Sequence, residues 1–323
     1  MMQGYVVVGD RLKRVDDCTA NLDNVVWADL MNPTREEEAA IEAWLGVGIP
    51  TREEMEEIEI SSRLYVENGF HFMTASLPSL GEDDALTMMP VTFVLAGKHL
   101  ITVRYHEPRA FKTFPAHAEK AAIGCTTGQT VLVGLLEAIV DRLADILEKV
   151  GHDIVHLSHD IFHPTAKKAS KRDSNFQRLL KAIGRKEDIT SGMSESLMTL
   201  QRLSGFLQHA TSGLKDKELQ TRVKTLGRDI SSLADYANLV SQKITFLLDA
   251  TLGMINIEQN AIIKIVSVAA VVFLPPTLVA SIYGMNFQII PELSWSFGYP
   301  LALFIMVISA VLPFAYFKRR GWL

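Results

Sequence analysis

The chain has 323 residues, of which 48% are hydrophobic and 21% charged, and its formal net charge at pH 7 is −5. This length allows one or two folded units besides any membrane segments, and the negative charge argues against nucleic acid as a main partner while being compatible with attraction of cations. The two cysteines, Cys18 and Cys125, provide neither a disulfide framework nor a CxxC metal motif, which fits a reducing cytoplasm.

Residues 1–125 are predicted to form a cytoplasmic α/β domain. Runs of β-branched and aromatic residues indicate strands, and Asn68-Gly69 between apolar flanks predicts a two-residue hairpin turn. Thr34 with Glu37, and Thr51 with Glu54, have the spacing of capping boxes and predict two helix starts. The predicted strands are Tyr5–Val8, Val25–Trp27, Phe70–Ala75, Val91–Leu95 and Leu100–Val103.

Residues 126–215 are predicted to form two helical arms. Apolar residues alternate in steps of four and three along the first arm, which indicates a coiled-coil seam on a helix that Pro164 ends. The seam comprises Leu136, Val140, Leu143, Leu147, Val150, Ile154, Leu157 and Ile161. After a basic turn at Lys167–Arg172, a second helix carries similar spacing from Met193 to Leu207. Their short connection predicts that the arms are antiparallel neighbours.

One uninterrupted helix is predicted from Asp216 to Tyr283, about 100 Å long at 1.5 Å per residue. Its cytoplasmic stalk, 216–264, has an apolar seam that can pack against the arms. The seam members are Leu219, Val223, Leu226, Ile230, Leu233, Ala237, Val240, Ile244 and Leu247. A second seam, which we call the polar stripe, follows on another face and mixes small, polar and apolar residues. Its members are Asp249, Gly253, Asn256, Asn260, Ile263, Ser267, Ala270, Leu274, Thr277, Ser281 and Gly284.

Residues 265–283 and 298–317 are each apolar and long enough to cross a bilayer. Lys264 precedes the first span and the basic tail, 318–323, follows the second, whereas the connecting loop, 284–297, has no Lys or Arg. This charge pattern predicts a multi-pass protein of the inner (plasma) membrane with both termini in the cytoplasm. A plain hairpin anchor is the alternative interpretation.

Polar residues inside a membrane span belong facing a protein interior or a water-filled cavity. The spacing of the polar stripe lets several copies of the helix turn this face toward a common axis, so we expect a homo-oligomeric pore. The alternative is that Ser267, Thr277 and Ser281 bond only to their own helix backbone or mediate close helix packing.

Several motifs together resemble the CorA family of magnesium transport proteins. They are Asn256–Asn260, Ile262–Ile265, Phe273–Thr277, Tyr283–Asn286, Pro291–Leu293, Trp295–Pro300 and Tyr316–Leu323. The resemblance implies an α+β cytoplasmic domain, long coiled-coil helices and two C-terminal transmembrane helices, in a funnel-shaped homopentamer surrounded by membrane lipid. It also implies potential-driven Mg²⁺ influx, possible transport of Co²⁺ and Ni²⁺, and gating by cytoplasmic Mg²⁺. Mg²⁺ is then substrate and regulatory ligand, and no separate cofactor is expected.

The resemblance assigns ion selectivity to Gly284, Met285 and Asn286, with Asn286 forming a ring at the outer mouth. Mg²⁺ dehydrates reluctantly, so a wide ring of amide oxygens suits its hydrated form. An amide dipole also avoids the tight hold of a fixed charge. Glu292 in the outer loop could concentrate cations or could be an ordinary surface charge.

The family pattern also implies a pore lining and regulatory carboxylates. Ile263 and Leu274 would form apolar constrictions, Asn260 and Thr277 polar stations, and Asp249 an acidic ring at the cytoplasmic end. The full predicted lining is Asp249, Asn260, Ile263, Val266, Leu274, Thr277 and Ser281. Candidate regulatory metal ligands are Asp83, Asp84 and Asp229, for which solvent-exposed surface charge is the competing interpretation.

A histidine stripe lies outside the resemblance. His152, His156, His159 and His163 each follow a seam position by two residues, so they should form an outward face. With Asp153 and Asp160 beside them, they could bind a transition metal or sense pH. A solvated polar face is the alternative.

Two other functions are compatible with the sequence. A zinc transporter of the ZntB kind would share the architecture, although Gly-Met-Asn with Pro-Glu-Leu favours magnesium. A membrane-tethered scaffold could recruit partners through the coiled-coil arms. We do not expect an enzyme, because the chain has no recognisable Ser/His/Asp order, metal-ligand set or phosphate loop.

Overall fold

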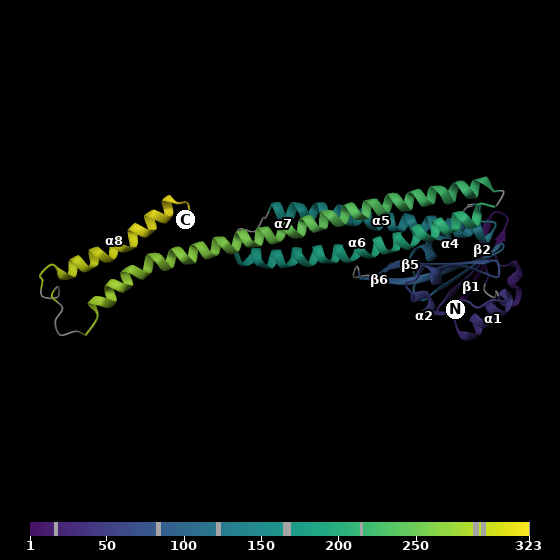
Figure 1. The fold of residues 1–323 in the computed structure, drawn as a ribbon, viewed down its shortest axis with the longest axis horizontal. Helices are drawn as coiled ribbons and strands as arrows, with labels where there is room; N and C mark the ends of the chain where they lie inside the picture. The colour runs from purple at the N-terminus through teal and green to yellow at the C-terminus, as the bar shows by residue number, and fades with distance from the viewer. Residues whose placement is uncertain are drawn as a thin grey trace. The chain divides into compact units, whose positions relative to one another are not determined.

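The computed structural model describes residues 1–15, 19–81, 85–120, 124–163, 169–213, 216–286, 291 and 295–322. The chain divides into two compact units, Met1–Leu248 and Asp249–Leu323. Figure 1 shows a sheet with short helices and long helices in the first unit, and two long helical segments in the second. The order of elements agrees with the predicted α+β domain, long helices and two apolar C-terminal helices.

A seven-stranded sheet is built from the described strands of the first unit, in the order β2-β1-β3-β7-β6-β5-β4. Neighbours are antiparallel except β3 and β7, which pair in parallel. The strands are β1 (Met2–Val8), β2 (Arg11–Val15), β3 (Trp27–Met31), β4 (Leu64–Glu67), β5 (Phe70–Leu80), β6 (Leu86–Ala96) and β7 (His99–Arg104).

Four of the five predicted strands are confirmed and are extended by the structure, but the predicted strand at Val25–Trp27 is displaced. The amide of Val25 donates to Leu22 O at 3.0 Å, closing the short helix η1 (Thr19–Asn24), so β3 begins only at Trp27. Strands β2 and β4 were not predicted. Both are edge strands, and an edge strand can carry charged residues that obscure the apolar pattern.

Both predicted capping boxes are confirmed, at the starts of α1 (Arg35–Leu45) and α2 (Arg52–Glu56). The hairpin turn is confirmed too, since Asn68 and Gly69 have φ of 49° and 83°, the positive pair that a type I′ turn requires. Two further helices, α3 (Ile60–Arg63) and α4 (Ala110–Lys120), complete the domain.

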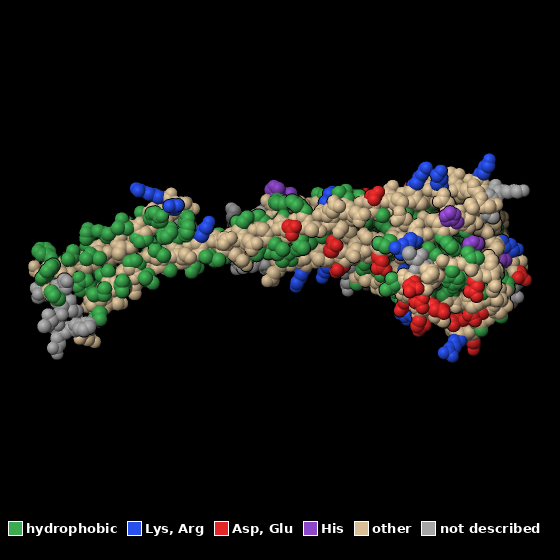
Figure 2. Space-filling view, viewed as in Figure 1, with side chains coloured by type: hydrophobic (Ala, Val, Ile, Leu, Met, Phe, Trp, Pro, Cys, Tyr) green, Lys and Arg blue, Asp and Glu red, His purple; other side chains and the backbone are tan. Residues whose placement is uncertain are grey.

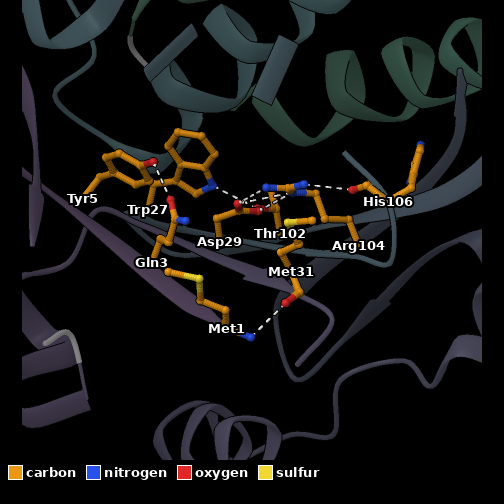
Figure 3. A network of polar contacts seen from close by, with 9 residues as sticks. All are labelled: Met1, Gln3, Tyr5, Trp27, Asp29, Met31, Thr102, Arg104 and His106. Carbon is orange, nitrogen blue, oxygen red and sulfur yellow. Dashed lines mark hydrogen bonds and ion pairs between the residues drawn. The ribbon is translucent and has the colours of Figure 1, made fainter. Parts of the chain in front are cut away.

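A buried polar network joins β3 to β7 (Figure 3). The guanidinium of Arg104 donates to both carboxylate oxygens of Asp29, with the shortest distance 2.7 Å, and to His106 O at 2.8 Å. Thr102 donates to Asp29 at 2.7 Å and accepts from the indole of Trp27 at 3.0 Å. The charges are therefore both paired and hydrogen-bonded, the condition under which a buried ion pair is tolerated.

The long helices α5 (Gly128–Phe162), α6 (Ala169–Thr211) and α7 (Lys217–Tyr283) follow (Figure 1). A Cβ at Gly128 would lie 2.5 Å from the His99 carbonyl carbon, so the start of α5 requires glycine where it meets β7. The thiol of Cys125, just before α5, is buried, which raises its pKa to about 11 and keeps it protonated. Cys18 lies outside the described residues.

The predicted seams are buried in this bundle. On α5 every seam residue is buried except Leu157, and on α7 every residue of the apolar seam, Leu219 to Leu247, is buried except Leu233. These two leucines are half-buried. An ion pair also links two of these helices. The ammonium of Lys186 on α6 lies 2.6 Å from the carboxylate of Asp153 on α5. The predicted basic turn is wrong in part, because α6 is helical from Ala169. Alanine, lysine and arginine are good helix formers and extend the helix toward its start.

The second unit contains the C-terminal part of α7 and α8 (Gly298–Arg319). By length and composition, α7 and α8 are each able to cross a membrane, with apolar windows of mean hydropathy 2.2 that are only 6% buried. Figure 2 shows hydrophobic side chains gathered over these segments. The predicted end of the first span at Tyr283 coincides with the end of α7, and α8 extends two residues beyond the predicted Phe317.

Candidate ion pathway

The polar stripe occupies an exposed face of α7. All of its members are exposed in the single chain, from Asp249 to Gly284. Ile263 and Leu274 expose 61% and 68% of their surface, and Val266, the further predicted lining residue, exposes 63%. Val268, by contrast, is 2% exposed on another face of the same helix. The predicted lining residues therefore share an open surface and do not pack inside their own chain.

A hollow of 470 Å³ lies along this face. Its lining combines apolar side chains with two hydroxyl groups, those of Thr277 and Ser281. The full lining is Ala270, Phe273, Leu274, Thr277, Leu278 and Ser281, and four of these six belong to the polar stripe. This face of the predicted membrane span thus carries both apolar and polar side chains, whereas a helix surrounded only by lipid would be apolar.

The hydroxyl of Thr277 donates a hydrogen bond to Phe273 O, one turn earlier, at 2.7 Å. This is the backbone bond that the alternative interpretation expects of a threonine inside a membrane helix. The bond uses the hydroxyl hydrogen and leaves the oxygen lone pairs able to accept. An acceptor is what the water shell of a hydrated cation requires, so the backbone bond and a pore-lining role are compatible.

The Gly-Met-Asn sequence follows directly after α7, which ends at Tyr283. The amide of Gly284 donates to Ala280 O at 3.0 Å, and that of Met285 donates to Ile282 O at 3.3 Å. A Cβ at residue 284 would lie 3.1 Å from Ala280 O, so a larger residue would disturb this last turn. Met285 and Asn286 are both exposed. The predicted selectivity residues therefore lie just beyond the end of a helix, and Glu292 is outside the described residues.

Pro275 and Pro276 lie within α7 and do not end it. Because proline has no amide hydrogen, the carbonyls of Val271 and Val272 receive no helical hydrogen bond from these residues. The helix is therefore weakened next to Leu274, the predicted constriction.

At the other end of the spans, a contact that the sequence did not predict joins α7 to the tail. The ammonium of Lys264 lies 5.9 Å from the centre of the Trp322 ring, and Arg320 lies 5.6 Å from that of Tyr316. The amide of Trp322 donates to Phe317 O at 3.1 Å, which turns the tail back. Aromatic residues next to basic ones are typical of a membrane interface. That pattern in the tail is the feature of the sequence from which these contacts could have been predicted.

The predicted regulatory carboxylates are only partly within the described chain. Asp83 and Asp84 lie outside it. Asp229 is exposed on α7, and its negative charge repels that of Asp141 on α5. Burial, and then the charges of Asp145, Glu137 and Asp229, raise the pKa of Asp141. Glu137, Asp141 and Asp145 line a groove of 550 Å³. Glu137 forms an ion pair with Arg222 at 2.6 Å, so its negative charge is already neutralised by a neighbour.

The four histidines of α5 are all exposed, as predicted, but they do not act as one group. His159 and His163 stack with ring centres 4.7 Å apart, whereas His152 lies 3.8 Å from Glu148. Asp153, expected beside the histidines, is instead paired with Lys186. Among the described residues, no group of three or more His, Cys, Asp and Glu side chains is arranged to hold a metal ion.

Comparison with known proteins agrees with the resemblance seen in the sequence. The family model for the CorA-like Mg²⁺ transporter protein matches residues 23–319. The magnesium transport protein CorA of Haemophilus influenzae is 35% identical over 324 residues, covering 100% of both chains.

Two solved structures are similar in fold. The CorA magnesium transporter of Methanocaldococcus jannaschii matches with a TM-score of 0.76 at 19% identity, covering 100% of this chain and 98% of that one. The ZntB cytoplasmic domain of Vibrio parahaemolyticus matches with a TM-score of 0.56 at 10% identity, covering 79% of this chain and 97% of that one. With a family match over most of its length and a full-length relative above 30% identity, this chain belongs to the CorA-like Mg²⁺ transporter family.

Proposed function

We propose that this protein is a homopentameric channel for Mg²⁺ influx across the plasma membrane, with both termini in the cytoplasm. The observation that carries the proposal is the polar stripe, which lies exposed along α7 and continues into the apolar span. Lipid is a poor neighbour for Thr277 and Ser281, whereas a water-filled axis shared by several copies would solvate them. Membership of a Mg²⁺ transporter family supports the choice of ion.

At the outer mouth, a ring of Asn286 side chains would select the ion. The carbonyl oxygens accept hydrogen bonds from the water shell of Mg²⁺, so the ion need not be dehydrated to enter. Gly284 keeps the last turn of α7 compact and Met285 separates it from the ring. Glu292 would add negative charge in the outer loop and raise the local cation concentration.

Further in, Leu274 and Ile263 would act as apolar constrictions that close by dewetting, with Thr277 and Asn260 as polar stations between them. Val266 and Ser281 complete the lining, and Asp249 would form an acidic ring at the cytoplasmic exit. Inward movement of two positive charges gains roughly 4.6 kcal/mol per 100 mV of inside-negative potential, so no nucleotide is required. Co²⁺ and Ni²⁺ would pass by the same route.

Cytoplasmic Mg²⁺ would provide feedback by binding carboxylates between neighbouring subunits. The candidates are Asp83, Asp84 and Asp229. An exposed Asp229 beside other acids of α5 supports this role, because a bound divalent cation would relieve repulsion among them. High internal Mg²⁺ should therefore slow uptake.

Zinc transport is the second candidate, supported by the likeness in fold to a ZntB cytoplasmic domain. At 10% identity that likeness concerns the fold alone, and it covers the cytoplasmic part. The two functions differ at the mouth, where an amide ring suits a hydrated hard cation and zinc prefers nitrogen or sulfur ligands.

The proposal is tested by reconstituting the purified chain in liposomes that contain a fluorescent Mg²⁺ indicator, under an inside-negative potential. We expect Mg²⁺ uptake by the wild type and its loss in Asn286→Ala. The matched control is Asn238→Ala, which removes an exposed amide from the cytoplasmic part of α7. Uptake of Zn²⁺ without Mg²⁺ would favour the second candidate, and equal Mg²⁺ uptake by all three proteins would refute the role of Asn286.

A further inference from the structure

The C-terminal end of α5 carries a pair of histidines that the ion pathway does not use. His159 and His163 are one helical turn apart, and both are exposed. Their ring centres are 4.7 Å apart and their planes are inclined by only 18°. The two rings therefore lie against each other on one face of the helix. Because both side chains are exposed, rotation about their side-chain torsions can turn one nitrogen of each ring toward a common point.

The backbone holds this pair in register. His163 caps α5, and its amide donates to His159 O at 2.9 Å, so the helical spacing is kept up to the second histidine. Asp160 lies beside the pair, with its carboxylate 4.0 Å from His159 Nδ1. A carboxylate at this distance adds negative charge next to the imidazoles and favours a cation there.

The other histidine pair on α5 has the same spacing but a different arrangement. His152 is oriented toward Glu148, one turn earlier, with 3.8 Å between Nε2 and Oε1. His152 thus contacts a carboxylate, whereas His159 contacts the second histidine of its own pair. Spacing alone therefore does not separate the two pairs, but their side-chain contacts do.

We propose that His159 and His163 form a two-histidine chelate for a divalent transition metal such as Ni²⁺, Zn²⁺ or Cu²⁺. Two histidines at i and i+4 on one helix face can bind a single ion, as in helical zinc motifs. Imidazole is a preferred ligand for these metals, whereas Mg²⁺ prefers oxygen. Because only two protein ligands converge, water fills the remaining positions and the ion exchanges readily.

The test is a calorimetric titration of the full-length protein with Ni²⁺ at neutral pH, carried out in detergent without any polyhistidine tag. Excess Mg²⁺ is present throughout so that oxygen-lined sites in the pathway are occupied. We expect His159→Ala and His163→Ala each to weaken Ni²⁺ binding by about tenfold or more. The His152→Ala/His156→Ala double variant, matched in residue type, spacing and exposure, should bind like the wild type.

A second measurement counts the ligands directly. Electron paramagnetic resonance of bound Cu²⁺ should show two coordinating nitrogens in the wild type and one in His163→Ala. Absence of Ni²⁺ binding under excess Mg²⁺ would overturn the proposal. It would also be overturned if binding were lost only in the His152→Ala/His156→Ala variant, or if the copper signal were unchanged by His163→Ala.

Discussion

The two parts of α7 carry the same three-and-four spacing but have opposite environments. In the part that precedes Asp249 the apolar seam is buried, as Leu226 and Ile244 show with 3% exposure each. In the membrane part the stripe is open, with Leu274 at 68% exposure. The apolar seam has α5 and α6 of its own chain to pack against, while the stripe has no such cover in the described chain. The same periodicity can therefore build a core or present a surface, according to its neighbours.

The largest expected effect comes from the buried seam. Leu226→Ala should lower the free energy of unfolding by about 2–5 kcal/mol, because it leaves a cavity among the helices. Leu239→Ala is the matched control on the same helix, where the side chain is 46% exposed and the change should stay within about 0.5 kcal/mol. Urea unfolding of the full-length protein in detergent, followed by circular dichroism, measures both. Equal losses would mean that burial does not distinguish the two faces.

Substitutions in the polar stripe should change the rate of Mg²⁺ uptake and leave the stability of the fold largely unchanged. Leu274→Asn makes the proposed constriction polar and should hinder dewetting, so Mg²⁺ uptake at high internal Mg²⁺ should rise by about tenfold. Leu312→Asn on α8 places the same polar group on a leucine with 64% exposure outside the stripe. Liposome uptake compares the variants. A rise of the same size in Leu312→Asn would argue against a constriction at Leu274.

A smaller effect is expected from a single hydroxyl in the pathway. Thr277→Val keeps the side-chain shape and removes the oxygen acceptor, which should slow Mg²⁺ uptake by about fivefold if one hydrogen bond to the hydrated ion is lost. Thr245→Val is a close control, because Thr245 makes the same bond to its own helix, to Ser241 O at 3.1 Å. Its removal should leave uptake unchanged. A similar decrease in both variants would point to the helix backbone as the cause.

The smallest effect concerns like charges between α5 and α7. The pKa of Asp141 is raised, mainly by burial and then by neighbouring acids, so the folded protein holds this proton more tightly than the unfolded chain. Stability is therefore lost as pH rises from the ordinary aspartate range through the raised pKa. Asp141→Asn should slightly raise the thermal midpoint at neutral pH, with no gain in acid and less gain in high salt.

Asp235→Asn is the control for this prediction, since Asp235 is an exposed acid on α7. It should leave the midpoint unchanged at every pH. An equal gain in both variants would indicate a general effect of net charge, and a gain in Asp141→Asn that persists in acid would contradict the raised pKa.

Local features of the fold could be predicted because their physical causes lie within a few residues. The capping boxes at Thr34 and Thr51 and the turn at Asn68-Gly69 depend on side chains and backbone angles three positions apart or fewer. The long seams of α5 and α7 were equally readable, because a helix repeats its environment at regular intervals. The motif at Gly284 to Asn286 pointed to the family for the same reason, since it is contiguous.

Contacts between distant segments could not be predicted. The Asp29–Arg104 pair joins residues 75 positions apart, and only the parallel pairing of β3 with β7 brings them together. The sequence likewise gave no reason to expect that Lys186 would take Asp153 away from the histidines, or that His152 would turn toward Glu148. These choices depend on which side chains from other elements, or from other turns, compete for the same group.

Sequence by itself thus determined which long segments are helical, which are apolar enough for a membrane, and which face of α7 is polar. Only the tertiary structure decided that the apolar seam of α7 is buried while the polar stripe stays open, and that the rings of His159 and His163 stack. The physical reason is that periodicity sets the direction of a side chain relative to its own helix. Whether a side chain is buried, and which group it contacts, depends on the side chains of neighbouring elements, and these are brought together only when the elements pack.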